Sequence, residues 1–457
     1  MLNKTPVEKN GKYTVSIYDI GITGEGIGKT DGFTVFVPQT VPGDVVEVLI
    51  LKVKKSFAYG KLLNVVSPSS FRQEPQCKYF YKCGGCQLLH MDYEKQLLFK
   101  TKKVCDALRV IGGFENIPVL PAIASPRIFN YRNKAQIPVA FKDNKVSMGF
   151  YANRSHRIID IDECAIQNEN TKIVQAKVKE YILESGVSCY DEETGKGLIR
   201  HILVKYGFKT GETGVCIIIN GDTVPKKELL LSKLLEVDGV SSITSNINKS
   251  RTNVILGEQT KLLWGRSYIV DTIGDLEFEI SPNSFFQVNP FSTEIVYSKV
   301  LEFASLCGNE NILDIYCGIG TISLFLARRA KRVFGVEIVP EAISDAVKNA
   351  KRNNIANAEF ICGDATDVLL DLNEKEGFKP DIIVVDPPRK GCEPSVLHTI
   401  IKSEAEKLIY VSCDPGTLAR DLKLLCENGY ELKTVQPVDQ FPQTVHVETV
   451  VLMSRVK

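Results

Sequence analysis

The chain has 457 residues, of which 44% are hydrophobic and 24% charged, a composition typical of soluble globular proteins and a length sufficient for about three domains. The sequence starts without an apolar segment of the signal-peptide type, and it contains no run of about 18 apolar residues. Secretion and membrane spanning are therefore not indicated, and we expect a cytoplasmic protein without a membrane partner. In that compartment, the 13 cysteines predict metal binding or catalysis rather than a disulfide framework.

The net charge of +1 conceals an uneven distribution along the chain. Residues 71–160 contain 15 Lys and Arg against 7 Asp and Glu, so this segment is basic and the remainder is acidic. Such asymmetry is expected where one part of a protein faces a phosphate backbone. A solvated basic face without a partner explains the charge alone equally well.

Three regions follow one another along the chain. Residues 5–65 alternate apolar and polar residues in short stretches separated by Gly-rich turns such as GITGEGIG, which predicts a small OB-like β-barrel. After a Pro- and Ser-containing linker, the pattern predicts a helix over 92–110, mixed strands between 120 and 280, and a helix over 168–185. We therefore expect a barrel at 1–67 and an α+β central domain at 68–280.

From residue 290 the sequence alternates apolar strands with amphipathic helices, as in NILDIYCGIG, TISLFLARRA and RVFGVEIV. This alternation predicts parallel strands joined by helical crossovers, and hence a Rossmann-like α/β domain at 281–457. Ligands of such sheets bind beyond the carboxyl ends of the strands.

A glycine-containing turn and three acids mark such strand ends. Gly318 and Gly320 lie between a predicted strand and a helix, where they allow a nucleotide-like ligand to approach the backbone. Ser323 replaces the third glycine of the dinucleotide fingerprint, which argues against NAD or FAD. Glu337 is placed to accept ribose hydroxyls, and Asp364 to reach an adenine amino group. Each acid alone is better explained as a helix cap, but their recurrence on successive strand ends favours a ligand site.

Asp386-Pro-Pro-Arg389 follows the next predicted strand. Two prolines cannot continue a strand, so they hold the preceding aspartate rigidly at the edge of the sheet. In S-adenosylmethionine-dependent enzymes, an Asp-Pro-Pro at this place borders the methyl acceptor. When Tyr or Trp follows, the acceptor is typically an exocyclic amine, whereas Arg389 follows here.

Cys413, in Val-Ser-Cys-Asp-Pro, ends the strand after that and is predicted to enter the same crevice. A thiolate that adds to C6 of uracil makes C5 nucleophilic, and a base must then remove the C5 proton. Glu448 is the candidate base. Arg389, Lys390 or a helix N-terminus after residue 415 are candidates for lowering the pKa of Cys413. The alternative is a small buried cysteine without a chemical role.

Six motifs together resemble the RNA uracil-5-methyltransferase family, specifically its bacterial 23S ribosomal RNA branch, over essentially the whole chain. They are CGGC with its flanking cysteines, SFFQVN, DIYCGIGT, DPPRKG, SCDP and HVET. The resemblance implies a class I methyltransferase fold at 281–457, a TRAM domain for the barrel, and 5-methyluridine formation at 23S sites of the uridine 1939 or 747 type. It also implies S-adenosylmethionine contacts, a nucleophile and a base at the matching positions: Gln287, Tyr316, Glu337 and Asp386, then Cys413, then Glu448.

Three alternatives stay open beside this interpretation. Transfer RNA is the second candidate substrate, although transfer RNA enzymes of this family typically lack both the TRAM domain and the cysteine cluster. A non-catalytic RNA-binding iron–sulfur protein would leave Cys413, Glu448 and Asp386 unexplained. An N-methylating enzyme would leave Cys413 without a role. We expect no obligate protein partner.

Four cysteines form a candidate metal site: Cys77, Cys83, Cys86 and the distant Cys164. By spacing alone, iron–sulfur and zinc are equally compatible, because zinc sites usually pair their cysteines in two CxxC motifs and only one is present. The family resemblance implies a [4Fe–4S] cluster at these residues. We expect it to have a structural or RNA-docking role, because the proposed chemistry needs no redox step.

The candidate RNA contacts are basic residues and one aromatic residue: Arg132, Lys134, Arg157, Arg200, His201, Arg389 and Phe286. A stacked uracil hides C6 from a thiol, so the target uridine must be extruded or already looped out. Phe285 or Phe286 is then placed to stack on it, although each is individually more typical of a core residue.

Overall fold

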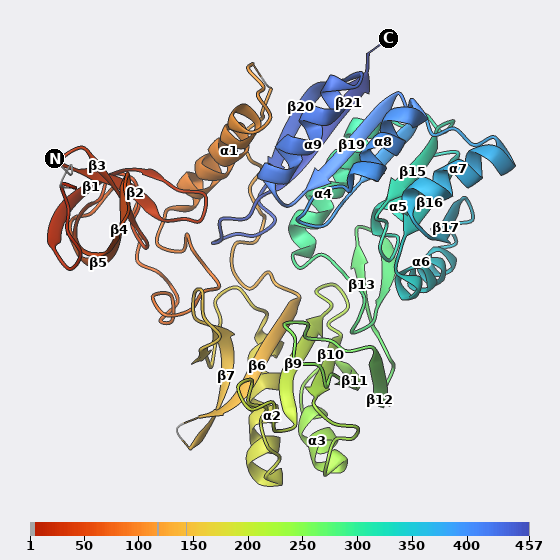
Figure 1. The fold of residues 1–457 in the computed structure, drawn as a ribbon. Coiled ribbons are helices and arrows are strands. Elements are labelled where there is room, and N and C mark those ends of the chain that lie inside the picture. The colour runs from red at the N-terminus through yellow and green to blue at the C-terminus, as the bar shows by residue number, and fades with distance from the viewer. Residues whose placement is uncertain (1–4, 117, 143, 457) are drawn as a thin grey trace.

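A computed structural model describes residues 5–116, 118–142 and 144–456. A closed five-stranded barrel begins the fold, with neighbouring strands in the order β1-β2-β3-β5-β4 (Figure 1). Alternate apolar side chains such as Val15, Val35 and Val48 fill its interior, which confirms the predicted barrel. Its strands are β1 (Lys12–Ile20), β2 (Gly26–Thr30), β3 (Phe33–Val37), β4 (Val45–Val53) and β5 (Phe57–Ser67).

Strand β2 lies where the sequence predicted only a Gly-rich turn. A Cβ on Gly28 would come 2.3 Å from Val15 Cγ1, and one on Gly26 would come 2.0 Å from Thr40 Oγ1. The glycines therefore serve close approach within a strand and do not interrupt it.

The middle of the chain forms a seven-stranded sheet with the order β12-β11-β10-β9-β6-β7-β8. Helices α2 and α3 pack on it around Val174, Val178 and Leu230. Helix α2 was predicted over 168–185; Asn168 caps it, and Gly186 ends it with a left-handed φ of 72°. The elements are β6 (Lys134–Lys142), β7 (Lys145–Tyr151), β8 (Ile158–Asp160), α2 (Glu169–Ser185), β9 (Ile199–Tyr206), β10 (Thr213–Ile219), α3 (Lys227–Leu234), β11 (Val240–Ile247) and β12 (Gln259–Gly265).

The last part of the chain forms a second seven-stranded sheet with the order β17-β16-β15-β18-β19-β21-β20. Strands β15 to β19 are parallel, as predicted, and the added β21 runs antiparallel between β19 and β20. The strands are β15 (Asn311–Ile315), β16 (Arg332–Glu337), β17 (Ala358–Cys362), β18 (Ile382–Val385), β19 (Lys407–Ser412), β20 (Tyr430–Val438) and β21 (Glu448–Arg455), and the helices are α4 (Pro290–Ala304), α5 (Thr321–Ala327), α6 (Pro340–Arg352), α7 (Ala365–Glu376), α8 (Pro394–Ser403) and α9 (Pro415–Glu427).

Two elements outside 281–457 contribute to the core of this sheet. Helix α1 (Tyr93–Val110), predicted over 92–110 and capped by Asp92, packs Val104 and Leu108 against α9 on the face that α7 and α8 also cover. The hairpin of β13 (Ile269–Ile273) and β14 (Leu276–Ile280) packs with α4, α5 and α6 on the other face. The limits of the domains stay a prediction. No helix of the described residues combines the length and apolar character needed to cross a bilayer.

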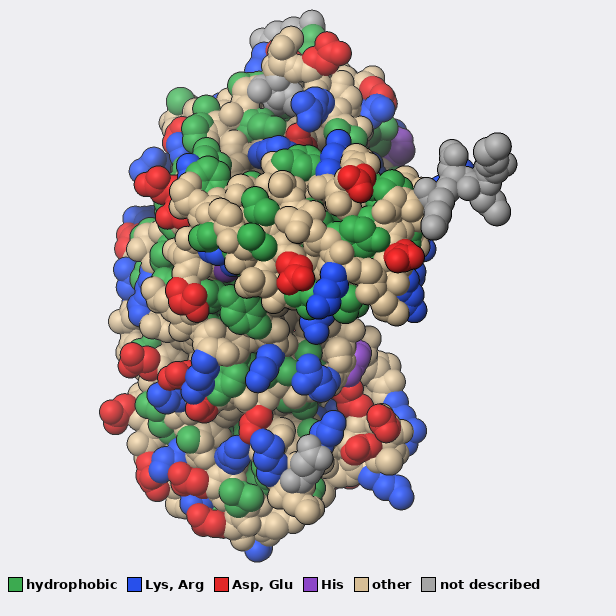
Figure 2. All heavy atoms as spheres, turned by 90° about the vertical axis from the view of Figure 1, so that its left-hand side faces the viewer, with side chains coloured by type: hydrophobic (Ala, Val, Ile, Leu, Met, Phe, Trp, Pro, Cys, Tyr) green, Lys and Arg blue, Asp and Glu red, His purple; other side chains and the backbone are tan. Residues whose placement is uncertain are grey.

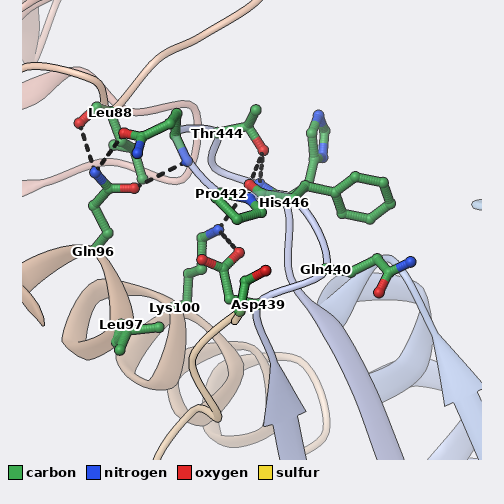
Figure 3. A network of polar contacts seen from close by, with 12 residues as sticks. Leu88, Gln96, Leu97, Lys100, Asp439, Gln440, Pro442, Thr444 and His446 are labelled. Carbon is green, nitrogen blue, oxygen red and sulfur yellow. Dashed lines mark hydrogen bonds and ion pairs between the residues drawn. The ribbon is translucent and has the colours of Figure 1, made fainter. Parts of the chain in front are cut away.

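The segment 439–447, which joins β20 to β21, lies between α1 and the sheet. Lys100 of α1 reaches into it, pairing with the Asp439 carboxylate and donating to the Phe441 carbonyl at 3.0 Å (Figure 3). Both charged side chains are fully buried. Burial lowers the pKa of Lys100, while the adjacent carboxylate opposes that shift. The pair therefore anchors this segment through a fully desolvated contact.

Further hydrogen bonds to the segment 439–447 come from the rest of the molecule. Gln96 of α1 donates to Gln443 Oε1 at 2.9 Å, and Tyr131 donates to the Pro442 carbonyl at 3.0 Å. Asn289, at the start of α4, donates to the Gln440 carbonyl at 3.1 Å. The connection between the last two strands is consequently held by α1, by Tyr131 and by the start of α4.

Breaking the buried pair with Lys100→Met should destabilise the protein by about 3–5 kcal/mol, because Asp439 would be left buried without a cation. Urea unfolding followed by circular dichroism measures this loss. Lys100→Met combined with Asp439→Asn should recover much of it. Lys102→Met removes an exposed pair with Asp106 on the same helix and should cost less than about 1 kcal/mol. Equal losses for Lys100→Met and Lys102→Met would contradict the anchoring role.

Candidate active site

The strand register brings Cys413 and Glu448 together. Ser412, the last residue of β19, pairs with Thr449 of the antiparallel β21, so the next pair in register is Cys413 with Glu448. Glu448 is only 2% exposed, whereas Cys413 is partly exposed. Asp414 then caps α9 by accepting from the amides of Gly416 and Thr417 at 2.9 and 3.0 Å. The chain therefore turns away directly after the cysteine.

Asp386 follows β18, the neighbour of β19, and adds a second acid to this place. Burial raises the pKa of Asp386 to about 7, opposed by a hydrogen bond with the Gln287 side chain. Burial and the neighbouring Asp386 also raise the pKa of Glu448 well above its usual value. Two close carboxyl groups cannot both ionise easily, so the pair favours retention of a proton.

The same environment opposes ionisation of Cys413. Burial raises the pKa of the Cys413 thiol to about 12, with further contributions from Glu448 and Asp386. Arg389 lowers it. Of the three candidates that the sequence offered, Lys390 is paired with Glu393, and the α9 N-terminus is capped by Asp414, whose own charge raises the thiol pKa. Arg389 is therefore the cation that acts on the thiol.

The loop that carries Arg389 is held by a buried acid that sequence reasoning did not identify. Asp421 of α9 accepts from the Cys392 amide at 2.9 Å and from the Tyr410 hydroxyl at 2.7 Å. Gly391 has a φ of 79°, and a Cβ there would come 2.5 Å from Asp421 Oδ2. No sequence signal pointed to Asp421, because an acid within an amphipathic helix ordinarily faces solvent.

The predicted cofactor residues lie at the carboxyl edge of the same sheet. Gly318 and Gly320 have φ values of 55° and 82°, and an added Cβ on Gly318 would meet no atom within 4 Å, so the backbone there is open to a ligand. Tyr316 shares this strained turn, with a φ of 68°. Ser323, in place of a third glycine, is hydrogen-bonded to the buried Asp314, whose pKa burial raises to about 7.

Glu337 is the last residue of β16, and Asp364 follows β17. Glu337 Oε1 accepts from the amides of Ile338 and Val339 at 2.8 and 3.1 Å, which orients the carboxylate. Asp364 is exposed and caps α7 by accepting from the Thr366 amide at 2.8 Å. The capping explanation thus holds for Asp364, whose contact with a ligand stays a prediction.

Comparison with known proteins agrees with this arrangement. A family model described as tRNA (Uracil-5-)-methyltransferase matches residues 244–456, and a TRAM-domain model matches residues 6–63. An uncharacterized RNA methyltransferase of Clostridium tetani is 50% identical over 99% of this chain and 98% of its own, and one of Halalkalibacterium halodurans is 48% identical over 98% of each. The chain belongs to the RNA uracil-5-methyltransferase family. It is therefore an S-adenosylmethionine-dependent RNA methyltransferase with a TRAM domain.

A solved structure extends the likeness of this methyltransferase to the whole fold. The Pyrococcus abyssi tRNA (uracil-54, C5)-methyltransferase in complex with S-adenosyl-L-homocysteine is 29% identical, with a TM-score of 0.77 over 96% of this chain and 100% of that chain. The fraction of our chain left unmatched is too small to contain the barrel. A barrel of this kind is therefore shared with a transfer RNA enzyme, which weakens its use as evidence against a transfer RNA substrate.

The four predicted cysteine ligands of the methyltransferase line one cavity of about 290 Å³. Its wall includes Arg132, whose buried Nε has no hydrogen-bond partner among the described residues. Burial raises the pKa of Cys83 to about 11 and those of Cys86 and Cys164 above the usual value. Within the described residues, no three Cys, His, Asp or Glu side chains are grouped as closely as a metal-ion site requires. The sulfurs converge on a shared space without forming such a group.

The predicted basic RNA contacts divide into three sets. Arg157 and Arg389 are exposed, and Arg132 and Lys134 line the cysteine cavity. Arg200 and His201 are only 5% and 7% exposed, and Arg200 donates to the carbonyls of Asn248 and Ser250 at 2.7 and 2.8 Å. This burial corrects the expectation that Arg200 and His201 face RNA.

The aromatic prediction also needs correction. Phe286 is 5% exposed and packs in the core with Phe278, whereas Phe285 is 64% exposed. Adjacent residues of an extended segment point to opposite sides, and the sequence did not reveal which of the two faces solvent. Phe285 is the member of the pair that is accessible to a base.

Reactivity of Cys413 should report the charges around it. Asp386→Asn removes a negative charge and should lower the pKa of the thiol, which speeds alkylation at pH 8 on the order of tenfold. Arg389→Met should slow it. Iodoacetamide labelling measured by peptide mass spectrometry tests both signs, with the exposed Cys307 as an internal reference. Equal rates in the three proteins would contradict the assigned electrostatics.

Proposed function

We propose that this methyltransferase forms 5-methyluridine through a covalent bond between Cys413 and C6 of the target uracil. The observation that carries the proposal is the register of β19 and β21, which sets Cys413 opposite Glu448 and beside Asp386. A nucleophile and a base on adjacent strands match the two groups that the reaction requires.

In this mechanism, Cys413 loses its proton to solvent, and its thiolate attacks C6 of the ring. The new S–C6 bond moves the C5–C6 electrons into an enolate that extends to O4. Bound S-adenosylmethionine would supply the electrophilic methyl group for C5, with its sulfonium–methyl bond breaking and S-adenosyl-L-homocysteine as the leaving group. The Glu448 carboxylate then takes the C5 proton, the C5–C6 double bond re-forms, and the Cys413 thiolate leaves. The raised pKa of Glu448 suits a base that must accept a weakly acidic proton.

S-adenosylmethionine is proposed to lie along the carboxyl edge of β15, β16 and β18. The open backbone at Gly318 admits a ligand, and Glu337 offers an oriented carboxylate for ribose hydroxyls. The family resemblance adds Tyr316, Gln287 and Asp386 as contacts.

We propose 23S ribosomal RNA as the substrate, as the resemblance of the motifs to the ribosomal branch suggests. A band of Lys and Arg side chains crosses the middle of the face that Figure 2 presents and supports contact with a phosphate backbone. Transfer RNA is the second candidate, favoured by the full-length likeness to the Pyrococcus abyssi enzyme.

The four cysteines are proposed to hold a [4Fe–4S] cluster. Their shared cavity and thiolate-forming donor set fit such a centre. No step of the methyl transfer uses it, so its role is to join the cysteine segment to the middle sheet.

RNA that contains 5-fluorouridine should trap the enzyme, because fluorine at C5 cannot leave as a proton. With S-adenosylmethionine, we expect a covalent complex stable in denaturing gels for the wild type and for Cys307→Ala, and none for Cys413→Ala. With ordinary uridine, Glu448→Gln should accumulate the same complex and lower turnover on the order of 10²- to 10⁴-fold. A full adduct yield from Cys413→Ala would exclude the proposed nucleophile.

The substrate is decided by running the same trap on two RNAs. A 23S transcript and a transfer RNA transcript, each containing 5-fluorouridine, are offered at equal concentration. We expect the adduct on 23S RNA, at a single uridine or at two. If the adduct forms on transfer RNA alone, transfer RNA is the substrate and ribosomal RNA is not. The proposed chemistry would be unaffected by that result.

Anaerobic reconstitution with iron and sulfide should give a brown protein with about four irons per chain. Cys86→Ser and Cys164→Ser should bind less iron, whereas Cys426→Ser, a cysteine of α9 outside the cavity, should not. Bound zinc without iron would overturn the cluster assignment.

A further inference from the structure

The barrel packs directly on the segment 439–447. A Cβ on Gly24, in the loop between β1 and β2, would come 2.8 Å from Val445 Cγ1, so only glycine permits the observed approach. Val445 lies in an apolar cluster with Ile20 and Val41 of the barrel and Phe99 of α1. An element of the RNA-binding domain is thereby in contact with a residue three positions before Glu448.

Lys103 of α1 closes this contact with hydrogen bonds. Its Nζ donates to the Ile22 carbonyl of the barrel loop at 3.1 Å and to the Val445 carbonyl at 2.8 Å. The charged groups around it are Asp414 and Arg389 of the active site, Lys100 of α1 and Glu25 of the barrel. Lys103 therefore lies where the barrel, α1 and the catalytic edge of the sheet meet.

The two halves of the segment 439–447 are held differently. Lys100, Gln96 and Tyr131 hold its first half, up to residue 443. In the second half, the Thr444 amide donates to the Phe441 carbonyl and the His446 amide donates to Thr444 Oγ1, both within the segment, whereas the Val445 carbonyl accepts from Lys103. The last residues before Glu448 are thus held from outside by the packing of Val445 and Val447 and by two cations, Lys103 at the Val445 carbonyl and Arg389 near His446.

We propose that Lys103 is a positioning residue, which ties the β1–β2 loop of the barrel to the segment 439–447 and so sets Glu448 against Cys413. The barrel then supports the active site as well as binding RNA. This inference rests on the proposed role of Glu448 as the base. Because Glu448 acts after methyl transfer, its displacement slows release of the enzyme from RNA rather than attack on uracil.

The test uses Lys103→Met in the full-length enzyme, with Lys102→Met as the matched control. Lys102 is the adjacent residue of α1 and also contacts the barrel, through Asp19 at 3.3 Å, but its side-chain contacts are with acids outside the segment 439–447. We expect Lys103→Met to lower kcat on the order of 10- to 100-fold, with KM for RNA changed less than about twofold. With ordinary uridine RNA and S-adenosylmethionine, it should accumulate the covalent protein–RNA complex, and Lys103→Arg should recover most of the turnover.

Two glycine variants test the same contact from the barrel side. Gly24 and Gly32 both have a positive φ, 87° and 76°, but an added Cβ meets Val445 only at Gly24 and meets nothing within 4 Å at Gly32. Gly24→Ala should accumulate the covalent complex and Gly32→Ala should not, although both substitutions place an alanine at a positive φ and so strain the backbone in the same way. Melting temperatures of all variants identify any loss that is merely unfolding.

Three outcomes are distinguishable. The positioning role is wrong if Lys103→Met and Lys102→Met have the same kcat and accumulate the same amount of covalent protein–RNA complex. It is also wrong if Lys103→Met raises KM for RNA and leaves kcat unchanged. In either case the barrel serves RNA binding alone. If Lys103→Met fails to fold, the Gly24→Ala and Gly32→Ala pair decides. If the wild type forms no 5-fluorouridine complex on either RNA, the proposed function itself fails.

Discussion

The fold depends on one desolvated contact, the ion pair between Lys100 and Asp439. Removing two charges from water is costly, so such a pair is weak evidence for stability by itself. Its value here is topological, because it joins a helix early in the chain to the connection between the last two strands. Tyr93 adds a hydrogen bond to the second Asp439 oxygen at 2.9 Å, which satisfies the carboxylate in its buried position. Because a buried charge without its partners is energetically costly, the Lys100–Asp439 pair specifies a single arrangement of the segment 439–447.

The electrostatics next to that segment favour neutral side chains. Burial raises the pKa of Asp386 to about 7 and that of Cys413 to about 12, and it lowers the pKa of His446 to about 4. Arg389 supplies a positive charge there, 3.5 Å from His446 Nε2, and acts on both Cys413 and Glu448. Under the proposed mechanism, its position matters twice, because it favours the ionised form of the nucleophile and of the base.

The sequence predicted the regular parts of the fold well and the connections poorly. Alternation and glycine turns locate the parallel strands and their carboxyl ends, so the sequence predicts Cys413, Asp386 and the Gly318 turn at one edge of the sheet. The antiparallel β21 has no such signal, yet its register is what brings Glu448 next to Cys413. Arg200 was misassigned because a basic residue in an apolar strand gives no indication that main-chain carbonyls enclose it. Lys103 and Asp421 act on main-chain groups far away in sequence, which no local pattern encodes.

The proposed cluster acquires a physical role from the same junction. Residues Gln87 and Leu88, directly after Cys86, donate their amides to the Gln443 carbonyl at 3.1 and 3.0 Å. A centre that fixed Cys86 would therefore also fix two amides on the segment before Glu448. The cysteine segment and α1 donate to carbonyls of that segment, and the barrel loop packs against it at Val445. A cluster bound at these cysteines would therefore act on methylation through the two amides that hold Gln443, without any electron transfer.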